Sequence, residues 1–368
     1  MKNGAVIGSV QLRRHFRVSA PGRVCLFGEH SDYLSLNVIT AAIDLRINMD
    51  VHTRPDDLIR IRYLDLNEND EFRIGMPASY RRKRDYVRGA FNVLLSEGIV
   101  PLRGADIEIR GNIPMNGGLA SSSALTVAAV LTGAALSGRT LDRKTIVKYA
   151  FRAEVLEFGE SGGSMDHTAC TYGNIVHVDC GPQPQVTELP AGIHGLVIGD
   201  SREKKRDTVG DLRKIRGTVE QGYTALRNII DGFDQRTSPL TEVMKHASSL
   251  PADVKRMTLT TLRNRDLTAR AFALLRSPAP DPRTLGQMID EHHALMRDGL
   301  DRSTPKIERL IDAAKEAGAL GCKINGSGGG GTILAYAPGR ETEVMRAIER
   351  EGGTPYLVRV VGGAAVVR

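Results

Sequence analysis

Two kinds of hydrophobic pattern divide the first half of the chain between strands and helices. Apolar and polar residues alternate over 36–54, 58–64 and 105–110, which is typical of half-buried strands. Apolar residues recur at helical spacing over 85–98 and 124–136. This half is therefore expected to mix strands with helices.

Local signals add three expectations to this half. Pro21 and Gly22 interrupt an apolar run over 16–28, and such a pair favours a turn between two strands. A further helix is expected from Asp142 to Phe158, with the Asp142 side chain as its N-cap. Two short strands are expected at 174–179 and 194–200.

The second half begins with helical patterns and ends with a strand and helix mixture. The expected elements are a helix-rich stretch over 207–300, a helix over 305–317 stopped by Gly318, a strand over 333–337, a helix over 340–351 and a strand over 355–361. The change from strands to helices puts a domain boundary within 180–205. We expect two domains, over 14–190 and 191–368.

Small residues precede the helical run at 124–136. Residues 116–123, which we call the phosphate loop, read Asn-Gly-Gly-Leu-Ala-Ser-Ser-Ser. Small side chains let backbone N–H groups approach a ligand, and the helix that follows adds partial positive charge at its N-terminus. Both features favour phosphate. The alternative is an ordinary Gly/Ser turn with an N-capping serine.

A second glycine-rich segment follows far along the chain. Residues 326–331 read Gly-Ser-Gly-Gly-Gly-Gly, and we call them the glycine loop. Ordering so many glycines in a helix or strand costs too much conformational entropy. The segment is therefore expected to be a loop that approaches a ligand or another loop closely. Two such loops in one chain are stronger evidence for an anion site than either alone.

Polar side chains cluster at two further turns. Gly28 to Tyr33 reads Gly-Glu-His-Ser-Asp-Tyr, and its carboxylates and imidazole are able to hydrogen-bond a polyol. A solvated Asx turn is the alternative. Asp166, in a loop of small residues, is a candidate general base, or the N-cap of a helix. Ser123 and Glu154 carry oxygen ligands of the kind that Mg²⁺ takes, although a lone helical Glu is more often solvated.

Composition narrows the classes of partner. Of 368 residues, 5% are aromatic and none is Trp, which disfavours a stacking platform for single-stranded nucleic acid. The net charge of +7 includes basic clusters at 81–84 and 202–206, each with acids nearby, which favours a solvated basic face and anion-binding residues. No nucleic-acid or membrane partner is expected. Four dispersed cysteines and the lack of an apolar run long enough to cross a bilayer favour a cytoplasmic enzyme.

Three motifs, in order, resemble the GHMP kinase superfamily of galacto-, homoserine, mevalonate and phosphomevalonate kinases. They are Pro21-Gly22-Arg23 through His30, Pro114 through Ala124, and Gly321 through Thr332. The resemblance implies an α+β fold of two domains. The N-terminal domain would be ribosomal-protein-S5-domain-2-like, and the C-terminal domain ferredoxin-like and helix-rich. It also implies a kinase that uses ATP and Mg²⁺.

The turn at 28–33 is most similar to the Gly-Glu-His-Thr-Asp-Tyr signature of galactokinases. Similarity to that branch implies roles for a larger set of residues. These roles are catalysis by Asp166 and Arg23; sugar binding by Glu29, His30, Asp32 and Gly163; ATP binding by Asn116, Gly117, Gly118, Leu119, Ala120, Ser121, Ser122 and Ser123; magnesium binding by Ser123 and Glu154; and support of the active site by Gly326, Ser327, Gly328 and Gly329.

Some positions depart from the galactokinase pattern. Residues 1–18 carry no recognisable galactokinase signature, His167 replaces the usual Gln after the catalytic-type Asp, and residues 303–318 are more similar to mevalonate kinase. The favoured interpretation is a sugar kinase acting on the anomeric hydroxyl, with the sugar and the oligomeric state left open. The alternatives are a mevalonate-type alcohol kinase and a non-catalytic sugar or nucleotide sensor.

Overall fold

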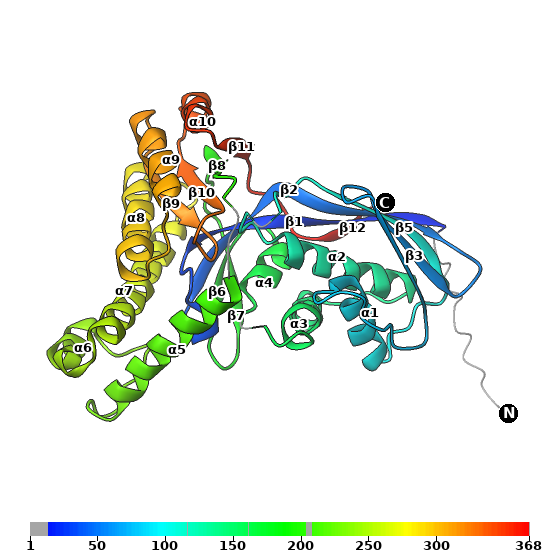
Figure 1. Cartoon of the computed structure of the whole chain (residues 1–368), viewed down its shortest axis with the longest axis horizontal. Coiled ribbons are helices and arrows are strands. Elements are labelled where there is room, and N and C mark those ends of the chain that lie inside the picture. Colours follow the sequence, from blue (N-terminus) through cyan, green and yellow to red (C-terminus); the bar gives the residue numbers. More distant parts are fainter. Residues whose placement is uncertain (1–13, 116, 161, 204–207, 368) are drawn as a thin grey trace.

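Two β-sheets, each with its own helices, make up the fold. The computed structural model describes residues 14–115, 117–160, 162–203 and 208–367. In that part, eight strands form one sheet, with order β12-β1-β2-β5-β3-β4, in which β6 pairs with β2 and β7 pairs with β6. Four more strands form a second sheet, with order β11-β8-β10-β9. Figure 1 shows helices α1 to α4 together on one face of the first sheet, and the second sheet with the longer helices at the other end of the molecule.

The elements are bounded as follows. The first half contains β1 (His15–Phe27), η1 (Asp32–Leu34), β2 (Val38–Thr53), β3 (Leu58–Tyr63), β4 (Glu68–Arg73), α1 (Tyr86–Ser96), β5 (Ala105–Gly111), α2 (Ser121–Leu136), α3 (Arg143–Phe151), the π-helical turn η2 (Arg152–Leu156), α4 (Met165–Tyr172), β6 (Ile175–Asp179) and β7 (Gln185–Leu189). The second half contains β8 (Leu196–Asp200), α5 (Thr208–Arg227), α6 (Leu240–His246), η3 (Ala247–Ser249), α7 (Ala252–Leu275), α8 (Pro282–Ala294), η4 (Leu295–Gly299), α9 (Pro305–Glu316), β9 (Gly321–Asn325), β10 (Thr332–Tyr336), α10 (Glu341–Arg350), β11 (Thr354–Val358) and β12 (Ala365–Val367).

Helix α2 lies at the centre of the first half and fixes where the phosphate loop ends. Most of its residues are buried, and many are Ala or Gly. A Cβ atom at Gly133 would lie 2.4 Å from Leu94 Cδ1 of α1, so a larger residue there would displace the Leu94 side chain. Small residues therefore let the helix pack against its neighbours on all sides, and its N-terminus is held rigidly beside β1.

The expected turn at Pro21-Gly22 was wrong, because β1 runs through both residues. Its pairing with β2 shifts register there, from Pro21 opposite Arg46 to Gly22 opposite Ile43. This β-bulge accommodates the missing N–H of Pro21 without ending the strand. A Cβ atom at Gly22 would lie 2.8 Å from the carbonyl oxygen of Leu119. The glycine therefore lets the phosphate loop lie directly on the strand.

The helix expected from Asp142 begins as predicted but changes its winding. The Asp142 side chain accepts a hydrogen bond from Thr145 N, as an N-cap does. The α-helical part, α3, ends at Phe151 and continues as the π-helical turn η2, which carries Glu154. Such turns occur often at functional sites. The segment around Asp166, expected to be a loop, is instead the first turn of α4.

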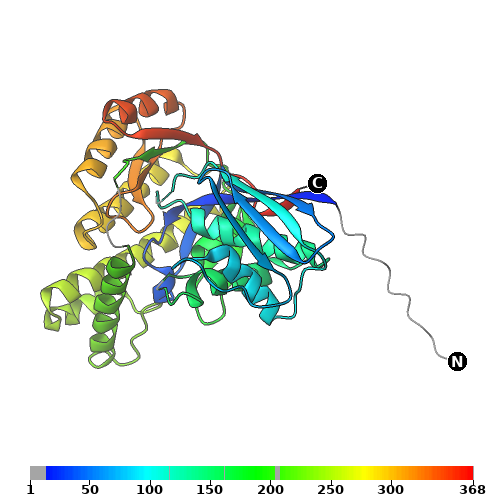
Figure 2. The ribbon, with the colours of Figure 1, turned by 45° about the vertical axis from the view of Figure 1, so that its right-hand side comes forward.

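The last strand returns to the first sheet. Strand β12 pairs with β1, with Arg17 opposite Val367 and Ser19 opposite Ala365, although its residues belong to the expected C-terminal range. The division at 190/191 stays a prediction. Figure 2 shows this red strand beside blue β1, away from the second sheet.

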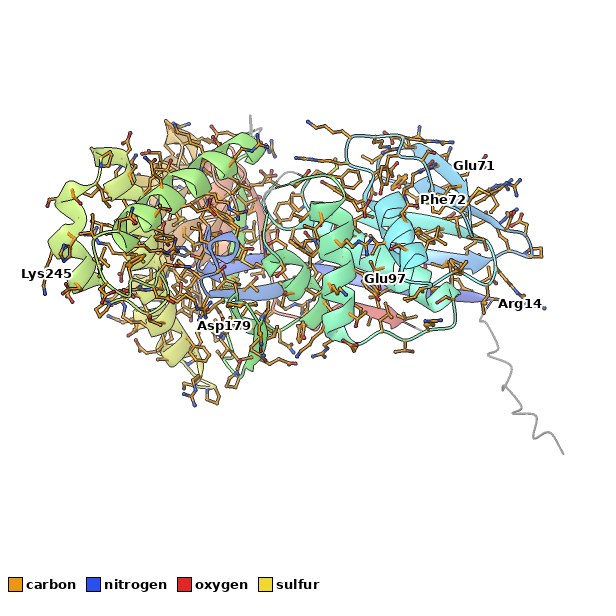
Figure 3. All side chains as sticks on the ribbon, turned by 90° about the horizontal axis from the view of Figure 1, so that it is seen from below. Arg14, Glu71, Phe72, Glu97, Asp179 and Lys245 are labelled. Atoms are coloured by element: carbon orange, nitrogen blue, oxygen red, sulfur yellow. The ribbon has the colours of Figure 1, made fainter. Side chains whose placement is uncertain are left out.

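A side chain from the second half crosses to the first. The Arg236 guanidinium donates to Ser35 O at 2.6 Å and to the Asp179 carboxylate at 2.6 Å. Figure 3 places Asp179 between Lys245 at one end of the molecule and Glu71 at the other.

Among the described residues, no helix is both long enough and apolar enough to cross a membrane.

Candidate active site

Arg23 and Asp166 face each other beside the phosphate loop. Arg23 Nε and Nη2 donate to the two carboxylate oxygens of Asp166 at 2.7 and 2.8 Å, and Nη1 donates to Gly118 O. Arg23 is 4% exposed. Burial opposes the charged guanidinium, but Asp166 and other nearby acids raise its pKa overall. The two residues are 143 positions apart in the sequence, and the fold forms a bidentate ion pair from them.

The phosphate loop leads into α2 through left-handed backbone. Gly118 has φ +78° and Ala120 has φ +60°. Leu119 O accepts a hydrogen bond from Arg23 N at 3.1 Å, which ties the loop to β1. The helix then begins at Ser121, so its free N–H groups lie at the end of the loop. Asn116 lies outside the described residues.

Ser123 and Glu154, expected to bind magnesium, are brought together. The carboxylate of Glu154 hydrogen-bonds the hydroxyls of Ser122 and Ser123, and one oxygen lies 2.8 Å from His167 Nε2. Burial alone would raise the pKa of Glu154, but His167 and the two serines lower it. All of these groups lie at the N-terminus of α2. Glu154 is therefore an ionised acid beside the phosphate loop and not a solvated surface residue.

Asp32 lies on the same side as Asp166. Its Oδ2 accepts from Met165 N at 3.4 Å, and a Cβ atom at Gly163 would lie 2.1 Å from that oxygen. Burial, and then the negative charge of Asp166, raise the pKa of Asp32 to about 6. Gly163 thus leaves room for a carboxylate that is only partly compensated. Residues 32, 163 and 166 together form one acidic wall.

His30 completes this side of the turn. It is 6% exposed and has φ +62°. Its Nδ1 lies 2.8 Å from the hydroxyl of Tyr33, and the two rings meet edge to face. This left-handed backbone turns the chain so that Asp32 faces α4.

Glu29 points the other way. Its carboxylate contacts Lys323 Nζ on β9 and accepts from the N–H of Gly326, the first residue of the glycine loop. Glu29 is 2% and Lys323 0% exposed. Burial raises the pKa of Glu29, while Lys323 and Gly326 oppose that shift. Lys323 also donates to Cys25 O at 2.9 Å. The structure thus places Glu29 in a buried ion pair behind the acidic wall.

The glycine loop lies against the phosphate loop. Its glycines all have positive φ, from +70° to +107°. A Cβ atom at Gly326 would lie 2.9 Å from Gly118 Cα, which explains why this position is glycine. Arg302 holds the far side of the loop by donating to Ser327 O at 3.0 Å and accepting from Gly329 N at 2.8 Å. The expectation that the glycine loop closely approaches another loop is confirmed.

Four residues with clear roles in this geometry were not among the expected site residues. His167 holds Glu154, Lys323 neutralises Glu29, and the side chains of Asn325 and Thr332 hydrogen-bond the phosphate loop. In the sequence, His167 stands out only as a departure from the galactokinase pattern. Lys323 lies between the apolar residues Cys322 and Ile324, and this was a signal, because a buried lysine needs an acid as partner.

Comparison with known proteins agrees with this geometry. Residues 85–174 match the family described as GHMP kinases N terminal domain, and residues 271–354 match GHMP kinases C terminal. Residues 9–52 match the galactokinase galactose-binding signature. The expectation that residues 1–18 carry no part of such a signature was therefore wrong.

Relatives of two activities are similar to the chain over most of its length. It is 30% identical to the mevalonate kinase of Pyrococcus furiosus, covering 93% of this chain and 95% of that one. It is also 30% identical to the galactokinase of Actinobacillus succinogenes, covering 91% and 88%. The structure of Lactococcus lactis galactokinase with galactose superposes with a TM-score of 0.85 at 19% identity, covering 96% and 95%. The chain belongs to the GHMP kinase family, phosphotransferases that use ATP and an alcohol acceptor, as its three motifs indicated.

Proposed function

We propose that this protein transfers the γ-phosphoryl group of ATP to the anomeric hydroxyl of a neutral sugar. The observation that carries the proposal is the acidic wall formed by Asp32, Gly163 and Asp166. Mevalonate is itself a carboxylate, and two acids in one acceptor site repel an anion. Carboxylates instead accept hydrogen bonds from the several hydroxyls of a sugar. The match of residues 9–52 to a galactose-binding signature supports the same choice.

Asp166 is the proposed partner of the reacting hydroxyl. The Asp166 side chain is 29% exposed, whereas the Arg23 side chain paired with it is 5% exposed. An acceptor hydroxyl is therefore able to reach Asp166 from the solvent side while Arg23 holds the carboxylate from behind. The hydroxyl donates its proton to Asp166 as its oxygen bonds to the γ-phosphorus, and the bond from that phosphorus to the β,γ-bridging oxygen breaks to release ADP. Phosphoryl transfer depends mainly on such positioning.

Arg23 is the proposed stabiliser of charge. Because two of its nitrogens bind Asp166 and the third binds Gly118 O, the guanidinium is fixed between the acceptor site and the phosphate loop. It is not free to rotate toward solvent. A fixed cation at this point stabilises the negative charge of the transferring group without reorganisation.

The residues at the start of α2 fit a magnesium ion bound with ATP. Glu154 is ionised and lies with the hydroxyls of Ser122 and Ser123, so the donors are hard oxygens. Among the described residues, no group of three His, Cys, Asp or Glu side chains is placed to hold a metal. Ser123 and Glu154 would hold Mg²⁺ together with the nucleotide phosphates. When bound, the ion neutralises phosphate charge.

A substrate panel tests the proposal. The protein is incubated with ATP and Mg²⁺ and with neutral hexoses, pentoses, uronic acids or mevalonate, and ADP release is measured. Phosphorus NMR of the product distinguishes an anomeric phosphate from other esters. The expected result is turnover of a neutral sugar to its 1-phosphate, with Asp166→Asn as the inactive control. The absence of sugar-dependent ADP release would contradict the proposal. A cytoplasmic location, where ATP is made, belongs to the same proposal.

A mevalonate-type alcohol kinase is the second candidate. The 30% identity to the Pyrococcus furiosus enzyme favours it as strongly as the galactokinase relative favours a sugar. Turnover of mevalonate without turnover of any sugar would select it.

A further inference from the structure

Two side chains of the β9–β10 hairpin reach the backbone of the phosphate loop. Asn325 and Thr332 are cross-strand partners at the end of the hairpin that carries the glycine loop, and each is 0% exposed. Thr332 Oγ1 donates to Gly117 O at 2.7 Å, and Asn325 Nδ2 donates to Gly118 O at 2.7 Å. Two successive carbonyl groups of the loop are therefore held from one side, by residues more than 200 positions away.

The direction of a carbonyl group fixes the direction of the next N–H group. In a planar trans peptide, the C=O of one residue and the N–H of the next point in opposite directions. Holding the carbonyls of Gly117 and Gly118 toward the hairpin therefore turns the N–H groups of Gly118 and Leu119 away from it. Leu119 O accepts from Arg23 N, so the N–H of Ala120 is set by the same rule.

These N–H groups belong to a backbone that is shaped for an anion. Gly118 and Ala120 both have positive φ, and left-handed residues in close succession curl N–H groups into a concave anion-binding nest. The partial positive charge at the start of α2 lies at the same end of the loop. The carbonyls alone would repel phosphate. Turning them toward the hairpin removes that repulsion and exposes the donors.

We propose that Asn325 and Thr332 are positioning residues for ATP, which hold two peptide units of the phosphate loop so that the N–H groups of Gly118 and Leu119 face the phosphates. The inference rests on the proposed function only in that residues 116–123 bind ATP, and it is independent of the acceptor. Both side chains act through the loop backbone. The phosphate loop of the first half is thus held by hydrogen bonds from the second.

The two residues differ in how far their influence extends. Thr332 Oγ1 donates to Gly117 O at 2.7 Å and accepts from Asn325 Nδ2 at 3.5 Å. Asn325 Oδ1 accepts from Cys25 N at 3.1 Å, and the Gly118 O that accepts from Asn325 Nδ2 also accepts from the Arg23 guanidinium. Loss of the Thr332 hydroxyl is therefore expected to weaken phosphate binding, whereas loss of the Asn325 amide is also expected to lower kcat through Arg23.

The experiment compares nucleotides with and without phosphates. Thr332→Val keeps the shape of the side chain and removes one hydroxyl, and we expect the Kd of ATP, measured by calorimetry, to rise about tenfold. The Kd of adenosine, which has no phosphate, is expected to change less than about twofold. Thr332→Ser restores the hydroxyl and is expected to restore ATP affinity. Asn325→Asp is expected to raise the Kd of ATP and to lower kcat.

Thr261→Val is the matched control. Thr261 is 2% exposed, and its hydroxyl donates to a backbone carbonyl, Met257 O, at 2.9 Å within α7. This variant loses the same kind of buried hydrogen bond and is expected to keep the parent's affinity for ATP. The positioning role is overturned if Thr261→Val weakens the binding of ATP as much as Thr332→Val does. It is also overturned if Thr332→Val raises the Kd of ATP and the Kd of adenosine by the same factor.

A further variant separates this inference from the proposed function. Ser123→Ala alters the phosphate loop itself and is expected to weaken binding of ATP with Mg²⁺. If it has no effect, the loop is not the ATP site and both proposals fail. If it weakens binding while Thr332→Val and Asn325→Asp do not, the inference from the hairpin fails alone.

Discussion

Glu29 and Asp32 lie three residues apart in one turn, and the structure gives them opposite surroundings. Glu29 faces the second half, where Lys323 and the N–H of Gly326 compensate its charge. Asp32 faces Gly163 and Asp166. Burial raises the pKa of both acids, but the charges around Glu29 oppose that shift, whereas the negative charge of Asp166 adds to it at Asp32. A compensated acid holds the fold together, and a partly compensated one is available to a ligand. The comparison shows that sequence proximity does not give two acids the same role.

The largest expected effect concerns Asp166, the acid that faces Asp32. Asp166→Asn keeps the size of the side chain but removes the proton acceptor, so kcat is expected to fall about 10³-fold. The Kd of ATP is expected to change little, because Asp166 faces the acceptor and Arg23 keeps its bond to Gly118 O. Single-turnover kinetics and nucleotide calorimetry measure the two quantities. Loss of ATP binding would show that Asp166 is structural.

Loss of the ion pair between Glu29 and Lys323 is expected to lower the stability of the fold. Lys323→Met leaves the Glu29 carboxylate buried without its cation, and the free energy of unfolding is expected to fall by about 3–4 kcal/mol. The double variant Glu29→Gln/Lys323→Met removes both charges and is expected to recover much of that loss. Urea denaturation of the two variants and the parent measures this. A double variant as unstable as the single one would contradict the ion-pair explanation.

Asp32→Asn is expected to stabilise the fold and to raise the KM of the acceptor. The folded-state pKa of about 6 lies above the ordinary 3.8, so the folded protein holds this proton more tightly than the unfolded chain. The ionised carboxylate therefore costs stability above about pH 6, and this cost disappears below about pH 4. At pH 8 the variant is expected to gain about 1–2 kcal/mol in the free energy of unfolding.

The same variant is expected to raise the KM of the acceptor. In the parent, that KM is also expected to rise as the pH falls through about 6, because a protonated Asp32 accepts fewer hydroxyl donors. The pH profile of Asp32→Asn is expected to lack this step. Steady-state kinetics of the parent and of Asp32→Asn, measured from pH 5 to 8 at intervals of about one pH unit, test this prediction. An unchanged step in the variant would assign it to another group.

The smallest expected effect concerns the residue behind Glu154. His167→Ala removes the 2.8 Å contact that orients this carboxylate, and the affinity for Mg²⁺ in the presence of ADP is expected to fall about tenfold. His167→Gln retains an N–H donor and is expected to lose less. Paramagnetic titration with Mn²⁺ as a probe measures the difference. Equal losses in both variants would mean that shape, and not hydrogen bonding, holds Glu154.

The local features of this molecule were readable from the sequence, and its long-range contacts were not. The N-cap at Asp142, the helix after the phosphate loop and the two glycine loops were predicted because each depends on neighbours in the chain. The contact between Glu29 and Lys323 joins residues 294 positions apart, and no periodicity reports such a pairing. The family resemblance identified the fold, but it did not show which way each acid faces.

The failure at Pro21-Gly22 has a similar cause. The local preference of that pair for a turn is real, but β2 and the phosphate loop on either side of β1 outweigh it. The roles of Asn325 and Thr332 were not predicted, because a polar side chain at a strand end does not indicate which distant loop it will hydrogen-bond.

The return of β12 to β1 has a consequence for how the protein is made. On the ribosome, the sheet that carries Arg23 is almost complete once β7 has emerged, yet the outer edge of β1 at residues 17–19 waits for residues 365–367. An unpaired strand edge is a template for pairing with other chains. The nascent first half is therefore exposed to wrong pairing until residues 365–367 have been synthesised and have paired with β1.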